Sequence, residues 1–163
     1  MGRLAVMLLR GREGNELELA IVGYQFPDEA RDPWDSNWLL VNVRVLAPEG
    51  SWDVVDPCLT TWEAKGLVAW LVHAAARDPS SVPMTFAEPN LTIVARSRTS
   101  APLRVHVRAC LALELRPPWV HSAAGSDNLC VDLDVDRGDL ARAAASLLAD
   151  LVRFPQRGDD PTL

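Results

Sequence analysis

The chain has 163 residues, a net charge of −6, and 48% hydrophobic against 23% charged residues. These values are typical of a single globular domain with a substantial core, and they exclude an intrinsically disordered chain. The apolar runs are short and interrupted by charge, so the sequence also predicts no membrane-spanning helix, no signal peptide and a cytoplasmic location.

Alternation of apolar and polar residues predicts antiparallel strands through the first third of the chain. The predicted strands cover residues 3–9, 16–21, 39–46 and 52–55. Turn-like residues at 11–15 and 48–51 join these strands in pairs, and an acidic loop at 26–33 separates the second strand from the third. Such short turns favour a meander, in which consecutive strands pair.

A helix is predicted to follow the fourth strand. Thr60 and Glu63 have the spacing of a capping box, in which each side chain bonds to the other residue's free backbone N–H. Apolar residues then recur at helical spacing, at Leu67, Trp70, Leu71 and Ala74. Pro79 predicts the end of the helix near Arg77. Glu63 is therefore interpreted as a cap rather than as a catalytic acid.

The second half predicts further strands and a second helix. The expected strands cover residues 84–86, 91–95, 103–115 and 129–135. Asp136 is predicted to cap a helix that Pro155 ends. The predicted fold is α+β: one domain over residues 1–163, with a curved, mostly antiparallel sheet of about seven or eight strands and two packed helices. Residues 155–163 are expected to fray, and a two-sheet sandwich with helices covering its ends is the alternative.

Three short segments carry a resemblance to a known family. They are residues 23–27, 34–39 and 59–63, which read GYQFP, WDSNWL and LTTWE. With the turn at 88–91, they make this part of the chain resemble the WapI-type bacterial immunity proteins. The resemblance implies a protein that neutralises a toxin delivered by contact between neighbouring cells, with the toxin's C-terminal domain as its partner.

The sequence predicts no enzyme, no metal and no cofactor. The cysteines and histidines are Cys58, Cys110, Cys130, His73, His106 and His121. None has the paired spacing of a zinc site, and the cysteines are interpreted as buried free thiols. Ser80 and Ser81 lack a nucleophile elbow. Asp132, Asp134 and Asp136 could hold a cation on one strand face, but a solvated sheet edge with a helix cap is the commoner explanation.

The negative charge is concentrated in one part of the sequence. Residues 13–63 hold eleven acidic residues against Arg31 and Arg44. Such asymmetry creates a field that repels nucleic acid and attracts basic partners, while acids that merely solvate loops are the alternative. The predicted partner-binding residues are Asp28, Glu29, Asp32, Trp34 and Asp35, with the tryptophan as an anchor ringed by acids.

The tryptophans leave the partner surface open to two interpretations. Core or half-core positions fit Trp38, Trp62 and Trp70. Either the core or a surface patch fits Trp34, Trp52 and Trp119. The preferred function is an immunity protein that blocks a basic toxin domain, as the resemblance implies. A regulatory or structural interaction domain, forming homodimers through the Trp-rich surface, is the alternative, and neither function involves nucleic acid or a membrane.

Overall fold

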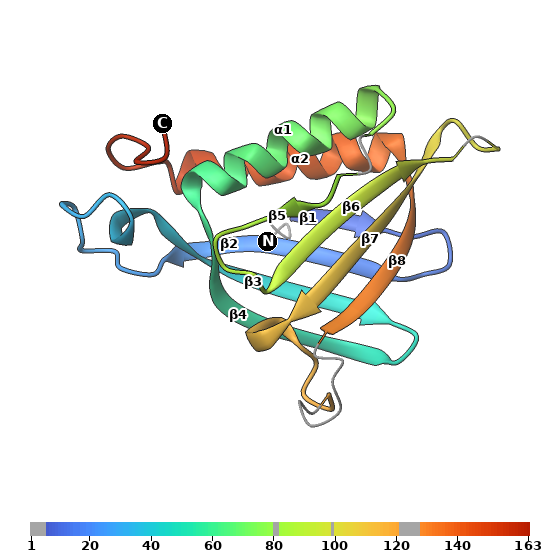
Figure 1. The fold of residues 1–163 in the computed structure, drawn as a ribbon, viewed down its shortest axis with the longest axis horizontal. Helices are drawn as coiled ribbons and strands as arrows, with labels where there is room; N and C mark the ends of the chain where they lie inside the picture. The colour runs from blue at the N-terminus through green and yellow to red at the C-terminus, as the bar shows by residue number, and fades with distance from the viewer. Residues whose placement is uncertain (1–5, 80–81, 99, 121–127) are drawn as a thin grey trace, which may run out of the picture.

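The computed structural model describes residues 6–79, 82–98, 100–120 and 128–163. These residues form eight strands and two α-helices, arranged as two antiparallel sheets under a pair of helices (Figure 1). The α+β class, the antiparallel pairing and the two packed helices are confirmed. Predictions made for Leu4, for Ser80 and Ser81, and for His121 lie outside the described residues.

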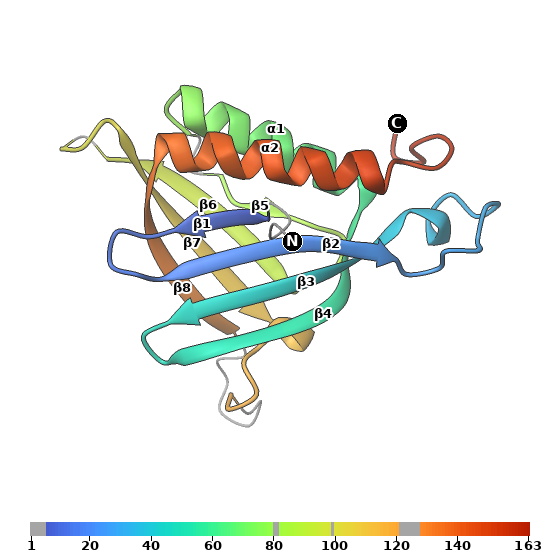
Figure 2. The same ribbon diagram turned by 180° about the vertical axis from the view of Figure 1, so that it is seen from behind.

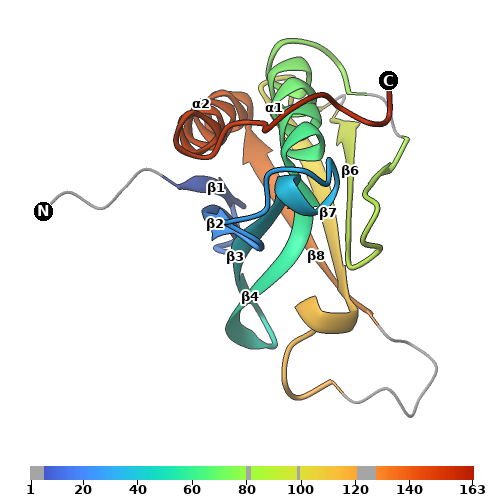
Figure 3. The same cartoon turned by 90° about the vertical axis from the view of Figure 1, so that its left-hand side faces the viewer.

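The strands divide into two four-stranded sheets, so the sandwich alternative describes the arrangement better than one curved sheet. Sheet A contains β1 (Met7–Arg10), β2 (Glu16–Tyr24), β3 (Trp38–Ala47) and β4 (Gly50–Thr60). Sheet B contains β5 (Met84–Thr85), β6 (Leu91–Ser97), β7 (Arg104–Ala112) and β8 (Asn128–Asp136). Each sheet follows sequence order, as expected for a meander, and the two sheets form separate layers (Figure 3).

The two helices lie side by side above the sheets (Figure 2). They are α1 (Thr61–Ala76) and α2 (Arg137–Arg153). Both predicted caps are confirmed: Thr60 and Glu63 form the capping box of α1, and the Asp136 carboxylate accepts a bond from the Gly138 N–H at 2.7 Å. Helix α2 packs on β1 and β2, where the buried carboxylate of Asp150 accepts a bond from the Ile21 N–H at 3.0 Å. Burial raises the pKa of this carboxyl.

The core lies between the facing sheets and beneath the helices. Alternate residues of each strand point inward and are buried, including Leu17, Val43, Val107 and Leu133. Trp52 also belongs to the core, with 7% of its surface exposed, and its indole N–H donates to the Leu115 carbonyl at 3.0 Å. This pattern follows from the period of two that the sequence shows.

Trp119 differs from Trp52 although the two rings are in contact. Their centroids are 5.4 Å apart with the rings edge to face, and Trp119 remains 41% exposed. Trp119 also lies against Gly50, which has φ of +144° at the β3–β4 turn. A Cβ at Gly50 would approach the Trp119 ring to 2.9 Å, so both the turn and this contact require glycine.

The long strand expected at 103–115 is shorter in the structure. β7 ends at Ala112, and a 3-10 turn, η2 (Leu113–Leu115), follows it. Leu113 has a positive φ of 51° and is 45% exposed, so it no longer alternates into the core. The apolar residue types continue the strand pattern, but the left-handed backbone at Leu113 redirects the chain.

The prediction of three free thiols is wrong for two of them. Cys110 and Cys130 form a disulfide bond, because the β7–β8 register places them directly opposite each other. Cys58 is a buried free thiol, as predicted. Burial, with the nearby Asp56 charge, raises the pKa of the Cys58 thiol to about 12, so it is unreactive near neutral pH.

Candidate functional site

The predicted partner-binding residues lie on the loop at residues 25–37, which joins β2 to β3 at one end of the molecule (Figure 1). The C-terminal segment contacts this loop at Arg157, whose guanidinium donates to the Pro27 carbonyl at 2.9 Å. Asp28, Glu29 and Asp35 line one surface cavity of about 400 Å³ together with Gln25, Phe26 and Pro27. The structure therefore brings three of the four predicted acids to one hollow.

Two of the four acids hold the loop in shape. The Glu29 carboxylate accepts bonds from the N–H groups of Arg31 at 2.7 Å and Asp32 at 3.1 Å. These backbone bonds lower the pKa of Glu29. The Asp32 carboxylate in turn accepts bonds from the N–H groups of Trp34 and Asp35, both at 2.8 Å. It thereby supports the entry into the short 3-10 turn η1 (Asp35–Asn37).

The other two acids are free for a partner. The side chains of Asp28 and Asp35 are exposed, and neither carboxylate forms a hydrogen bond or ion pair with the residues that the structure describes. Arg31 is the loop's own basic residue, and it also stays exposed. With four acids against Arg31, the loop therefore presents a net negative charge to the solvent.

Trp34 is placed beside these acids by a contact with α1. Its ring packs edge to face on Trp62, with 5.1 Å between the centroids, and 38% of its surface remains exposed. An edge-to-face pair restrains an aromatic side chain while leaving one side open. Trp34 is thus an ordered, half-exposed aromatic residue, as an interface anchor requires.

Arg157, in the C-terminal segment, contacts the loop, and the sequence analysis did not predict this. Its guanidinium donates to four backbone carbonyls of the loop, at 2.8–3.1 Å. These carbonyls belong to Ser36, Pro27, Glu29 and Phe26. The guanidinium carbon also lies 3.7 Å from the centroid of the Tyr24 ring. Fraying was expected from residue 155, but this part of the tail is hydrogen-bonded to the body of the protein.

Asn37 joins the loop, the tail and α1. The side chain is fully buried, and its amide N–H₂ donates to the carbonyls of Pro33 at 2.8 Å and Arg157 at 2.7 Å. Its carbonyl oxygen accepts bonds from the Thr61 hydroxyl at 2.8 Å and the Arg157 N–H at 2.9 Å. The WDSNWL segment could signal a turn, but nothing in it indicated these distant partners.

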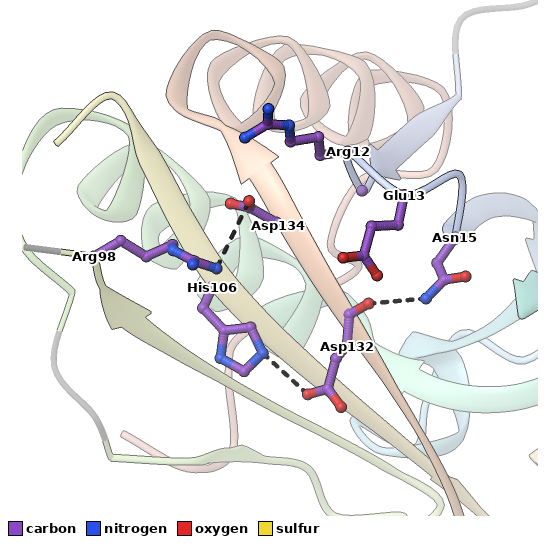
Figure 4. Close-up of a pocket in the computed structure, with 8 residues that line it drawn as sticks. Arg12, Glu13, Asn15, Arg98, His106, Asp132 and Asp134 are labelled. Carbon is purple, nitrogen blue, oxygen red and sulfur yellow. Dashed lines mark hydrogen bonds and ion pairs between the residues drawn. The ribbon is translucent and has the colours of Figure 1, made fainter. Parts of the chain in front are cut away.

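The acids of sheet B, considered as a cation site, are instead paired with basic residues. Asp132 bonds to His106 at 3.0 Å and to Arg108 at 3.3 Å, and Asp134 pairs with Arg104 at 3.1 Å and Arg98 at 3.6 Å. Figure 4 shows the polar hollow of about 450 Å³ beside them, which Arg12 and Glu13 of the β1–β2 turn also border. Asp136 is the cap of α2. Within the described ranges, no group of three or more His, Cys, Asp or Glu could hold a metal ion.

Comparisons with known proteins identify a family and no individual relative. The family model described as the immunity protein WapI-like family matches residues 7–155. No curated protein and no solved structure matches the chain. Among the described residues, no helix is long and apolar enough to cross a membrane.

Proposed function

Because the chain belongs to the WapI-like immunity protein family, we propose that it neutralises a cognate bacterial toxin domain by binding it through the acidic face around Trp34. The proposed contact residues are Asp28, Glu29, Asp32, Trp34 and Asp35. The observation that carries the proposal is the pair of exposed, unpaired carboxylates of Asp28 and Asp35 on the loop that holds the half-exposed Trp34. In this proposal the chain acts by binding and not by catalysis.

The proposed residues have different roles. Asp28 and Asp35 attract a basic target, such as a nuclease domain, and speed its diffusional encounter. Trp34 loses its remaining water on docking and slows dissociation. Glu29 and Asp32 contribute indirectly, because their carboxylates are already bonded to loop N–H groups. The partner is a protein domain, and the mechanism requires no metal, cofactor, nucleic acid or membrane.

A homodimeric interaction domain is the second candidate function. Leu148 and Val152 lie four residues apart on α2 and are 53% and 76% exposed, so a second copy of the chain would cover them in a dimer formed through this helix. A concentration-dependent dimer in sedimentation analysis, with no binding to any toxin domain, would favour this candidate.

The test is co-expression with the C-terminal domain of a toxin whose gene neighbours that of this protein, where one is found, together with binding kinetics at two salt concentrations. Asp28→Lys combined with Asp35→Lys is expected to lower the association rate by about tenfold and to remove its salt dependence. Trp34→Ala is expected to raise the dissociation rate by at least about tenfold, because a desolvated aromatic anchor acts after docking.

The matched control reverses the same number of charges at a distance. Glu13 and Glu49 are exposed and lie on the β1–β2 and β3–β4 turns, at the other end of sheet A from the loop (Figure 1). Glu13→Lys combined with Glu49→Lys should slow association much less than the loop variant. Equal slowing by the two double variants would mean that net charge, and not this face, guides the toxin.

A further inference from the structure

The C-terminal segment beyond α2 returns to the base of the acidic loop (Figure 3). The family match ends at residue 155, so Arg157 lies just outside it. Tyr24 positions Arg157 through two contacts. The Tyr24 hydroxyl donates to the Pro155 carbonyl at 2.6 Å, and the Tyr24 ring packs against the Arg157 guanidinium. A segment outside the matched region therefore takes part in building the candidate site.

We propose that Arg157 is a positioning residue that holds the loop at residues 25–37 in its partner-binding conformation, so that partner affinity depends on the C-terminal segment. This inference rests on the proposed function for its effect on affinity. Its effect on the loop is a property of the free protein and does not depend on any partner.

The choice of acceptors supports this role. An arginine side chain has five N–H donors in a planar fork, and Arg157 uses four of them on backbone carbonyls. The acceptors lie on both sides of the loop, at Phe26, Pro27 and Glu29 before its tip and at Ser36 after it. One rigid group thus ties together the two arms of the loop.

The same bonds direct the guanidinium to carbonyls instead of to the carboxylates of the loop. Arg157 bonds to a loop that carries four acids, yet its guanidinium has no ion pair with a carboxylate in the described part of the chain. The guanidinium supplies a donor to each of these carbonyls, and the Phe26 carbonyl also accepts a bond from the Glu29 N–H at 3.2 Å. Asp28 and Asp35 therefore keep their charges exposed toward the solvent, where a basic partner can reach them.

Lysine cannot replace this arrangement. Its ammonium has three donors on a single nitrogen and cannot reach carbonyls spread across both arms of the loop. The tail itself would remain attached, because the Arg157 backbone bonds to the Asn37 side chain through both its N–H and its carbonyl. Arg157→Lys therefore removes the clamp while keeping the charge and the path of the tail.

The experiment compares Arg157→Lys with the control Arg153→Lys. Arg153 lies four residues earlier, pairs with Asp150 at 3.6 Å, and stacks on Phe154 instead of bonding to the loop. Hydrogen exchange of the free proteins is measured at the loop amides of Ser36 and Asn37 and at the β7–β8 pair. Binding kinetics to the toxin domain are measured at the same two salt concentrations.

We expect exchange of the loop amides to accelerate at least about tenfold in Arg157→Lys, with no change at β7 and β8. The dissociation constant should rise about tenfold, mainly through slower association, because only the closed fraction of the loop is competent to bind. The salt dependence of association should persist, since the acids are untouched. Arg153→Lys should match the wild type in both measurements.

Two results would overturn the inference: unchanged loop exchange in Arg157→Lys, or a loosened loop with unchanged affinity and association rate. A general loss of stability would differ from both, because it would accelerate exchange at β7 and β8 as well. If wild-type protein does not bind the toxin domain at all, the proposed function fails, while the exchange measurement still decides whether Arg157 positions the loop.

Discussion

The acidic loop and the outer face of sheet B both carry carboxylates, but they use them in opposite ways. In sheet B the antiparallel register sets Arg108 directly opposite Asp132 and brings Arg104 diagonally within reach of Asp134, so arginines and carboxylates form ion pairs. In the loop the carboxylates bond to backbone N–H groups or to nothing within the described residues, and the guanidinium of Arg157 bonds to carbonyls.

The difference shows that the location of the arginines, and not the number of acids, decides which charges remain available. Exposed ion pairs such as those of sheet B contribute only about 0–1 kcal/mol each to stability, but they cancel the local field. The loop keeps a net negative charge because its four acids outnumber Arg31 and Arg157 and form no ion pair with either in the described part of the chain. We expect a basic partner to be drawn to the loop and not to sheet B.

The largest expected effect concerns sheet B. The Cys110–Cys130 bond closes a loop with a sequence separation of 20, and its reduction should lower the free energy of unfolding by about 3 kcal/mol. Chemical denaturation with and without a thiol reductant, alongside the Cys110→Ser and Cys130→Ser double variant, measures this effect. Toxin affinity of the folded reduced protein should stay unchanged. A parallel loss of affinity would contradict the separation of the two regions.

The second largest effect is expected for Asn37, the residue that joins the loop, the tail and α1. Asn37→Ala should lower the free energy of unfolding by about 2–3 kcal/mol, because it leaves the buried Thr61 hydroxyl and the Arg157 backbone without partners. Asn15→Ala is the matched control on the sheet B side, where the Asn15 amide makes one exposed bond to the Asp132 carbonyl. Urea unfolding measures the loss of unfolding free energy in both variants. Similar losses would show that Asn37 does not stabilise the loop more than an exposed asparagine does.

A smaller effect on the association rate is expected when the unpaired carboxylate of Asp35, and not the paired carboxylate of Asp132, is removed. Asp35→Asn should slow toxin association by about twofold to threefold, because one steering charge is lost. Asp132→Asn should leave association unchanged and alter stability by no more than about 1 kcal/mol, because its partners His106 and Arg108 form exposed pairs. The association rates of both variants with the toxin domain are measured by surface binding kinetics. Faster or equal association by Asp35→Asn would place the steering charge elsewhere.

The smallest effect is a pH dependence at Glu29. Backbone bonds from Arg31 and Asp32 lower the pKa of this carboxyl in the folded protein, so its support of the loop is present above its unfolded pKa. That support is lost as the pH falls through the lowered folded pKa, below the ordinary range of glutamate. NMR titration of the Arg31 and Asp32 amides should show this transition, and Glu29→Gln should abolish it. A transition at the ordinary glutamate pKa would mean that these bonds are absent.

Local chemistry made part of this protein predictable from its sequence. The capping box of Thr60 and Glu63 and the Asp136 cap involve groups within a few residues of each other, so spacing alone specifies them. The alternation in β2, β3 and β8 likewise determined which face each strand buries. The family resemblance came from the same kind of short segments, and the family is confirmed.

The tertiary structure decided what depends on residues far apart in the chain. The pairing of Cys110 with Cys130 required the register of β7 and β8. The contact of Arg157 with carbonyls about 120–130 residues earlier required the fold to bring both ends together. A backbone carbonyl is present at every residue and has no sequence signature, so only the folded chain shows which carbonyls an arginine can reach.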